Sequence, residues 1–280
     1  MIKITTIFAA ALIGLGLAGP VVAQEHGGAE IEKQHWSFAG LFGTYDENQL
    51  QRGFQVFREV CANCHSANLL AFRNLEEEGG PSFSEAQVKA LAAEYEVLDV
   101  GVEGGKRKAL PSDHWPAPFP NELEARAANG GALPPDMSVL AKARGVEDPF
   151  PNWVFNYFTT YSEGGPDYIH ALLNGYEETP PEGFQLPEGK HYNHVFPGHA
   201  IGMPPPLTDG QIAYAAAEGE TAVPLTVEQY SADVTSFLMW LAEPHLNEHK
   251  AAGFRVLSFL LLFAALMWFV KQRIWRNVEH

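Results

Sequence analysis

The only two cysteines of this 280-residue chain stand three positions apart, and a histidine follows the second directly. The run Cys61-Ala62-Asn63-Cys64-His65 is the C-x-x-C-H pattern in which two thiols are joined to the vinyl groups of one porphyrin and the adjacent imidazole binds the iron. The macrocycle demands this spacing. The motif therefore predicts one covalent haem c, with Cys61 and Cys64 as its attachment points and His65 as an axial ligand.

Three other kinds of site also use closely spaced cysteines. A thioredoxin-type dithiol follows a strand in a β–α–β pattern, whereas this motif ends a predicted helix in a chain without a parallel-sheet signal. A zinc site needs further ligands, for which His191, His194 and His199 are the clustered candidates. A structural disulfide would leave His65 without a role. The haem prediction accounts for all three motif residues.

The two ends of the chain are apolar. Residues 1–23 carry one cation, Lys3, before an apolar run, which is typical of a secretory signal peptide; an uncleaved anchor is the alternative. Residues 251–271 form a second apolar segment, about 30 Å long as a helix, which is enough to span a bilayer. Cations at its end place residues 272–280 in the cytoplasm by the positive-inside rule. A buried core helix is the alternative for this second segment.

Between these ends, residues 24–250 form the predicted exported domain. They hold 13 Lys and Arg residues against 33 Asp and Glu residues, a net charge of −20, compared with −16 for the whole chain. Phosphate would repel such a surface, so nucleic acid is not an expected partner. We favour a basic partner protein for this charge, with solubility alone as the alternative.

Apolar residues make up 46% of the chain, enough to bury a core, and their periodicity predicts a mainly helical domain. Helices are expected over residues 46–60, 84–95, 136–143, 167–174 and 226–243. Gly53 in the first of these is expected to allow another helix to approach closely. Long Pro/Gly loops are expected over 101–135 and 177–207, and a bulky cofactor would organise them. The aromatic segment 150–161 is either a helix or a packing loop, and 211–223 is a possible hairpin.

The second axial ligand of the iron comes from a methionine or a histidine downstream. Met203 follows a glycine and precedes three prolines, so it stands on a stiff loop whose backbone can approach a ring. Met239 is expected inside a helix and Met137 in packing. We therefore favour Met203, with His194 or His199 as the alternative. Thioether ligation raises the reduction potential, and two filled axial positions favour electron transfer over catalysis on a small substrate.

Several stretches outside the haem motif form a combination typical of one family. They are residues 51–56, 129–138, 141–144, 164–169, 192–193, 196–205, 233–234, 237–240 and 242–244. The Pro-Pro-Asp and Gly-Met-Pro-Pro stretches, with a single C-terminal apolar segment, are the most specific of these. On these residues the chain resembles the cytochrome c1 family, the haem subunit of the cytochrome bc1 complex (quinol–cytochrome c reductase).

The resemblance implies a mainly α, class I-type cytochrome c domain with long Pro/Gly loops around the covalent haem, plus one C-terminal transmembrane helix. It implies His65 and Met203 as the axial ligands. It also implies further residues that line the haem: Asn129, Pro134, Pro135, Arg144, Tyr168 and Pro206. Arg144 would face a propionate, although a solvated helix end is the simpler interpretation. Met137 is commonly leucine in relatives, which suits packing.

The resemblance also implies a function. Quinol is oxidised on cytochrome b, the mobile Rieske iron–sulfur protein carries one electron to this haem, and the haem passes it to a soluble or tethered cytochrome c, which contributes to the proton-motive force. The chain would have no substrate chemistry of its own. It would act in a dimeric complex of the bacterial inner membrane, with its haem domain in the periplasm.

Two other functions are the alternatives, a free-standing anchored cytochrome c shuttle and a non-haem thiol redox protein. A shuttle usually needs a flexible linker before its anchor, and residues 243–251 are too few to provide one.

Overall fold

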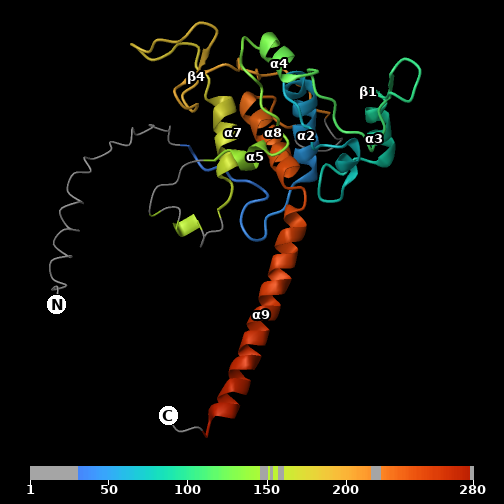
Figure 1. Ribbon diagram of the computed structural model, residues 1–280. Coiled ribbons are helices and arrows are strands. Elements are labelled where there is room, and N and C mark those ends of the chain that lie inside the picture. Colours follow the sequence, from blue (N-terminus) through green and yellow to red (C-terminus); the bar gives the residue numbers. More distant parts are fainter. Residues whose placement is uncertain (1–30, 146–150, 152–153, 157–160, 216–221, 278–280) are drawn as a thin grey trace, which may run out of the picture.

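The computed structural model describes residues 31–145, 151, 154–156, 161–215 and 222–277, and Figure 1 shows their arrangement. The described residues are mainly helical, as predicted. The predicted signal peptide, residues 1–23, lies outside the described residues. So do residues 278–280 of the predicted tail, most of the aromatic segment 150–161 and the middle of the possible hairpin.

Three helices meet at the centre of the domain: α2 (Glu47–Glu59), α7 (Gly164–Asn174) and α8 (Val227–Ala242). Helix α8 packs against both of the others (Figure 1). Asp46 and Thr226 cap α2 and α8 as predicted, because their side chains accept hydrogen bonds from backbone N–H groups three residues further on. Most of α8 is buried, so this helix forms the core of the domain.

Helices α2 and α8 touch backbone to backbone at Gly53. A Cβ on Gly53 would lie 2.1 Å from the Asp233 carbonyl oxygen and 2.8 Å from the Phe237 Cβ, so no larger residue fits. This confirms the predicted close approach. Beside the contact, Arg52 binds the fully buried Asp233 through two hydrogen bonds, Nε to Oδ2 at 2.9 Å and Nη2 to Oδ1 at 3.1 Å. The pair fixes the register of the two helices.

Aromatic rings gather around the buried Trp115 beside α2. The centroid of its ring lies 4.8 Å from that of Tyr95, 5.2 Å from that of Phe72 and 5.6 Å from that of Phe57. The Trp115 backbone N–H also donates to the Leu70 carbonyl oxygen at 2.7 Å. These contacts fix the stretch that follows the C-x-x-C-H motif.

The shorter elements lie around this centre. They are η2 (Cys61–Asn63), η3 (Phe72–Glu76), α3 (Glu85–Ala92), β1 (Glu96–Leu98), β2 (Lys106–Lys108), α4 (Glu122–Ala128), α5 (Leu140–Ala143), β3 (His191–Tyr192) and β4 (Ala200–Ile201). Strands β1 and β2 form one antiparallel pair, and β3 and β4 form another.

Several predicted boundaries were wrong. The expected loop 101–135 contains β2 and α4, and the expected loop 177–207 contains β3 and β4. These elements are two to seven residues long, too short to show a periodicity, and tertiary contacts hold them. Arg107 in β2, for example, binds Asp99 at 2.8 Å and Asp113 at 2.9 Å. The helix expected over 136–143 is confined to α5, because the side chain of Asp136 bonds the backbone of a neighbouring segment instead.

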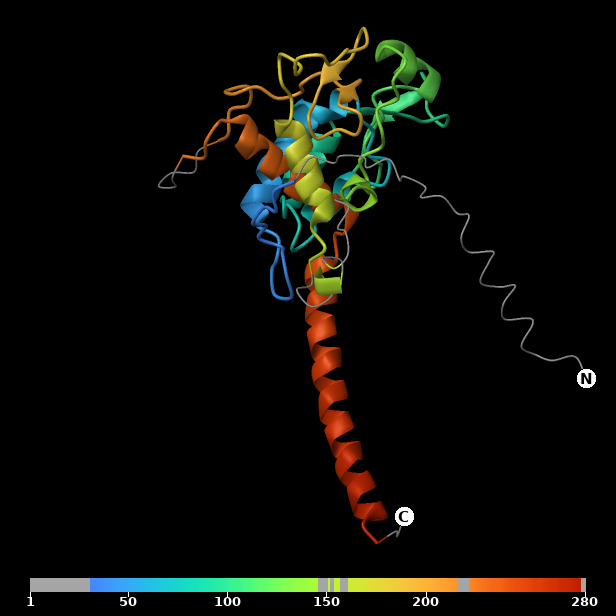
Figure 2. The same cartoon turned by 90° about the vertical axis from the view of Figure 1, so that its left-hand side faces the viewer.

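Helix α9 (Leu246–Trp275) extends away from the domain (Figures 1 and 2). It is the one helix among the described residues that is long and apolar enough to cross a membrane, and none of its apolar window is buried. Its 30 residues correspond to about 45 Å. The exposure contradicts the alternative of a buried core helix. The helix begins five residues before the predicted span, so only residues 243–245 separate it from α8.

Candidate functional site

A cavity of about 760 Å³ opens beside α8, α7 and α5 and under the loops around residues 128–137 and 189–206. Cavities that hold a cofactor measure about 300 to 1,000 Å³. All ten side chains predicted to bind or line the haem lie on its wall: Cys61, Cys64, His65, Asn129, Pro134, Pro135, Arg144, Tyr168, Met203 and Pro206. The fold therefore brings together residues from five separate stretches of the chain.

The end of α2 places the C-x-x-C-H motif at this cavity. Asn63 Nδ2 donates to the Glu59 carbonyl oxygen at 2.8 Å and so satisfies the last turn of α2. The 3₁₀ turn η2 then brings Cys64 and His65 back, because both of their backbone N–H groups donate to the Cys61 carbonyl oxygen, at 3.1 Å and 2.9 Å. One tight turn thus presents both thiols and the imidazole to the same cavity.

The thiol environment does not suit dithiol redox chemistry. Burial raises the pKa of Cys61 to about 12, and the nearby Cys64 adds to this effect. Redox-active dithiols have a lowered thiol pKa, because the thiolate is the nucleophile. A thiol that stays protonated at neutral pH counts against the non-haem redox alternative.

His65 is held in the form that a metal ligand requires. Its Nδ1 lies 2.8 Å from the Pro135 carbonyl oxygen, which can only accept, so Nδ1 carries the proton and Nε2 is left with its lone pair. Burial lowers the pKa of His65, which also favours the neutral ring. The sequence predicted Pro135 as a lining residue, and the structure shows that its carbonyl group also orients His65.

Asp136 ties the Pro-Pro-Asp stretch to the residues that follow the motif. Its Oδ2 accepts hydrogen bonds from Ser66 Oγ at 2.8 Å and the Asn68 backbone N–H at 2.9 Å, and its Oδ1 accepts one from the Ser138 N–H at 2.9 Å. Burial opposes ionisation of Asp136, but these hydrogen bonds outweigh it and keep its pKa below the usual value. The Met137 N–H adds a bond to the Ser66 carbonyl oxygen at 2.8 Å. We call residues 61–69 and 135–138 the proximal wall.

The loop over residues 189–206, which we call the distal wall, carries Met203. The buried Asn193 anchors this loop to the end of α7: its Nδ2 donates to the Leu172 carbonyl oxygen at 2.8 Å, and its Oδ1 accepts from the Val195 and Phe196 N–H groups at 3.0 Å and 3.1 Å. Tyr176, also just after α7, donates its hydroxyl to the Met203 carbonyl oxygen at 3.1 Å.

A glycine and a lysine stand next to Met203. A Cβ on Gly202 would lie 3.1 Å from the Ala132 Cβ and 3.2 Å from Lys190 Nζ, so this position is tight. Lys190 also lines the cavity. Neither Lys190 nor Tyr176 was singled out from the sequence, since both stand in loop segments without periodicity.

The other candidate ligands differ in whether they line the cavity. Met239 is buried in α8 and does not line the cavity, whereas Met137 does, from the proximal wall beside His65. His194 lies outside the cavity lining and contacts Glu177, Nδ1 to Oε1 at 3.1 Å, and His199 Nδ1 lies 3.4 Å from the Asn193 carbonyl oxygen. Within the described ranges, no three His, Cys, Asp or Glu side chains gather as a metal site, so the zinc alternative finds no support.

The rest of the wall fits a large, flat, mostly apolar group with an anionic edge. Aliphatic side chains of α7 and α8 supply the apolar surface: Ile169, Leu172, Leu173, Val234 and Leu238. Two cations, Arg144 and Lys190, also line the cavity. Arg144 is exposed, and its Nη1 donates to the Ala143 carbonyl oxygen at 3.3 Å. A tetrapyrrole with carboxylate substituents has this character.

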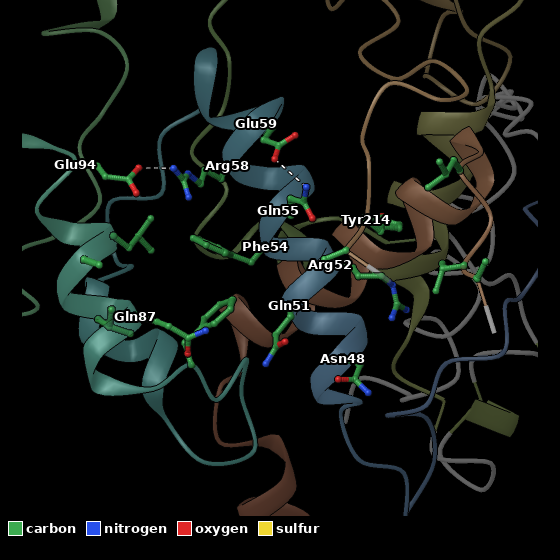
Figure 3. Close-up of a pocket in the computed structure, with 18 residues that line it drawn as sticks. Asn48, Gln51, Arg52, Phe54, Gln55, Arg58, Glu59, Gln87, Glu94 and Tyr214 are labelled. Atoms are coloured by element: carbon green, nitrogen blue, oxygen red, sulfur yellow. Dashed lines mark hydrogen bonds and ion pairs between the residues drawn. The ribbon is translucent and has the colours of Figure 1, made fainter. Parts of the chain in front are cut away.

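A second cavity, of about 720 Å³, lies between α2, α3 and the segment that ends at Ala215 (Figure 3). Its charged side chains are already paired: Arg58 binds Glu94, Arg52 binds Asp233, and Glu59 Oε1 accepts a hydrogen bond from Gln55 Nε2 at 2.9 Å. Among the described residues, this cavity therefore offers no unpaired charge to a ligand.

Comparison with known proteins agrees with the site. The model of the Cytochrome C1 family matches residues 36–278. "Cytochrome b/c1" of Bradyrhizobium diazoefficiens is 53% identical over 245 residues, which cover 86% of this chain but 35% of that longer protein. "Cytochrome c1" of Blastochloris viridis is 45% identical over 282 residues, covering 99% of this chain and 98% of the relative. "Cytochrome c1-2, heme protein, mitochondrial" of Solanum tuberosum is 42% identical, with 91% and 89% covered. On this breadth of similarity, the chain belongs to the cytochrome c1 family.

Proposed function

We propose that this chain carries one covalent haem c in the 760 Å³ cavity and passes electrons through it as a subunit of a quinol–cytochrome c reductase. The observation that carries the proposal is the convergence of the C-x-x-C-H motif and the other predicted haem residues on one cavity. The relatives support it, since several of them are named heme proteins.

In this proposal each wall of the cavity has a separate task. Cys61 and Cys64 hold the haem covalently, and His65 and Met203 are its axial ligands. The bound iron supplies reversible one-electron oxidation and reduction. The Pro135 carbonyl group keeps His65 in the ligating tautomer, the aliphatic wall excludes water, and Arg144 neutralises a propionate.

The electron would come from a Rieske iron–sulfur protein and leave to a cytochrome c. One relative is named for cytochrome b and cytochrome c1 together, which supports cytochrome b as a neighbour of this chain. The charge of −20 on residues 24–250 supports a basic cytochrome c as the acceptor, because opposite charge steers encounter. Electron transfer to a basic cytochrome c should then slow as salt is raised; a rate indifferent to salt would contradict steering.

We further propose that the haem domain is periplasmic and the C-terminus cytoplasmic. The cations Lys271, Arg273 and Arg276 at the far end of α9 support this orientation. Membrane anchoring itself follows from the length and the apolar surface of α9.

The link between α8 and α9 favours a complex subunit over a roaming shuttle. Glu243, in this link, contacts Lys142 of α5 and His249 of α9. Lys250 of α9 also donates to two carbonyl groups of the N-terminal segment. A three-residue connection held from both sides does not let the domain move freely over the membrane.

Purification from membranes in mild detergent tests the proposal. A haem-stained band of this chain should remain on a denaturing gel, and it should co-purify with a di-haem b-type cytochrome and a Rieske protein. A haem-stained chain that purifies alone would support the shuttle instead. A chain without stain would overturn the haem assignment.

A further inference from the structure

The segment that enters the domain, residues 36–45, forms a loop beside the first turns of α9, and both views show it there (blue in Figures 1 and 2). Two apolar side chains stand at its tip, Leu41 at 59% exposure and Phe42 at 76%. No residue from 36 to 45 is charged, although the surrounding domain has a net charge of −20. The tip is therefore an uncharged, apolar projection from an acidic domain.

The rest of the loop is fixed to the core, and these contacts hold its tip in the exposed position. Trp36, Phe38 and Tyr45 are buried at 4%, 1% and 6% exposure. Trp36 Nε1 donates to the buried Asp167 Oδ1 at 2.7 Å, and the Tyr45 hydroxyl donates to the Met239 carbonyl oxygen at 3.2 Å. Both stems of the loop are thus anchored to helices α7 and α8.

A tight turn holds the tip away from the domain. Gly40 has a φ of +68°, which favours glycine. A Cβ on Gly43 would lie 2.1 Å from the Ala39 carbonyl oxygen, so this position too accepts only glycine. The turn projects Leu41 and Phe42 outward, where the domain does not cover them.

Contacts with α9 set the depth of the tip. The ring centroids of Phe42 and Phe254 lie 6.0 Å apart, in an edge-to-face arrangement. Lys250 Nζ donates to the Phe38 carbonyl oxygen and, at 3.1 Å, to the Gly43 carbonyl oxygen. Phe254 lies in the first turn of the apolar span that begins at residue 251, so Phe42 lies level with the start of that span.

We infer that Leu41 and Phe42 enter the membrane surface at the boundary between headgroups and acyl chains, as a second membrane contact beside α9. Apolar and aromatic side chains favour this depth, and an uncharged tip is not repelled by anionic lipids. The contact is continuous with the span, which already lies in lipid. Two contacts instead of one fix the orientation of the haem domain above the bilayer.

Spin labelling of the intact complex in lipid nanodiscs tests this inference. A nitroxide is attached at Phe42→Cys and, separately, at Leu41→Cys, so that loss of the Phe254 contact in one variant does not decide the result. The control is Leu98→Cys, because Leu98 is 82% exposed and belongs to β1, a strand at the periphery of the domain in Figure 1. Power saturation then compares collisions with oxygen, which concentrates in the bilayer, and with a water-soluble nickel chelate.

The labels at positions 41 and 42 should collide several-fold more with oxygen than with the nickel chelate, and the label at position 98 should show the reverse. A nickel-accessible label at position 42 would overturn the inference. Labels shielded from both reagents would overturn it too, since they would show that another subunit covers the loop. The inference does not rest on the haem. Unsubstituted chain treated in the same way should carry no nitroxide; if it does, thiol attachment of the haem is contradicted, and its signal is subtracted from that of each variant before the loop is judged.

Discussion

The proximal wall, residues 61–69 with 135–138, and the distal wall, residues 189–206, face one cavity but are held by different means. On the proximal wall, Asp136 alone accepts three hydrogen bonds, and the imidazole of His65 has a hydrogen bond of its own to the Pro135 carbonyl oxygen. On the distal wall, the Tyr176 hydroxyl donates a hydrogen bond to the backbone carbonyl oxygen of Met203. The ring of His65 is thus fixed directly by a hydrogen bond, while Met203 is placed through the backbone of its loop. Substitutions that loosen the distal wall should therefore change the position of Met203 more easily than substitutions on the proximal wall change that of His65.

The largest effect is expected when the attachment atoms are removed from the proximal wall. In Cys61→Ala/Cys64→Ala, covalent haem should be lost completely, and the domain should unfold at lower denaturant because its 760 Å³ cavity lacks a bound group. A haem-stained denaturing gel measures the first effect and urea unfolding the second. Met203→Leu is the matched distal variant and should retain all of its covalent haem. A stained band from the double variant would contradict thiol attachment.

Two methionine substitutions test which wall supplies the second axial ligand. Met203→Leu should lower the midpoint potential by about 0.1 V or more, since axial ligands tune haem potentials over about 0.8 V. Redox titration measures this, together with the weak red absorption band of thioether-ligated ferric haem. Met137→Leu keeps the volume of a buried side chain on the proximal wall and should leave both unchanged. A lowered potential in Met137→Leu together with an unchanged potential in Met203→Leu would assign the ligand to Met137 and remove the distinction between the walls.

Polar groups on the two walls should differ in what they control. Asn193→Ala removes a fully buried amide and leaves its partners unsatisfied, so it should cost about 1–3 kcal/mol in the free energy of unfolding; Asp136→Ala removes hydrogen bonds from a half-buried carboxylate, and its cost should be nearer to about 1 kcal/mol. Asn193→Ala should also speed the binding of added imidazole to ferric haem, because it loosens the loop that carries Met203. Stopped-flow absorbance measures that rate. Equal acceleration by both variants would mean that the walls are mechanically coupled.

The lowered pKa of Asp136 predicts an acid limit for the proximal wall. An unfolded aspartate binds its proton near pH 3.9. Because the folded-state pKa is lower, the stabilisation is complete above about pH 4 and is lost as pH falls through the folded-state pKa. Urea midpoints recorded between about pH 2 and pH 6 should show this loss, and Asp136→Asn should flatten the curve. An unchanged slope in the variant would place the acid sensitivity elsewhere.

The smallest effect is expected from the single hydroxyl that positions Met203. Tyr176→Phe should cost about 1 kcal/mol of stability and raise the rate of imidazole binding a few-fold. Tyr45→Phe is the matched control, because its hydroxyl also bonds backbone carbonyl groups, those of Met239 at 3.2 Å and Glu243 at 3.1 Å, but neither of these belongs to the distal wall. It should lose similar stability and leave the rate unchanged. If both variants bind imidazole at the same rate, Tyr176 acts on stability alone.

Features carried by neighbouring residues could be predicted from the sequence. The capped helices α2 and α8 and the close contact at Gly53 came from local periodicity, caps and a single glycine. The ten site residues came from the motif and the family resemblance together, and all of them line the cavity. The strand pairs and helix α4 were missed, since two to seven residues show no period.

By itself the sequence determined what depends on local spacing: one C-x-x-C-H motif, an apolar segment at each end and a strongly acidic domain between them. Only the tertiary structure decided which atoms support these features. It brings the Pro135 carbonyl oxygen to His65 Nδ1, the Tyr176 hydroxyl to the Met203 carbonyl oxygen, and the ring of Phe42 to that of Phe254. The physical reason is the range of the interactions. Covalent spacing and helical periodicity act over a few residues, whereas these contacts join segments that only the folded chain brings together.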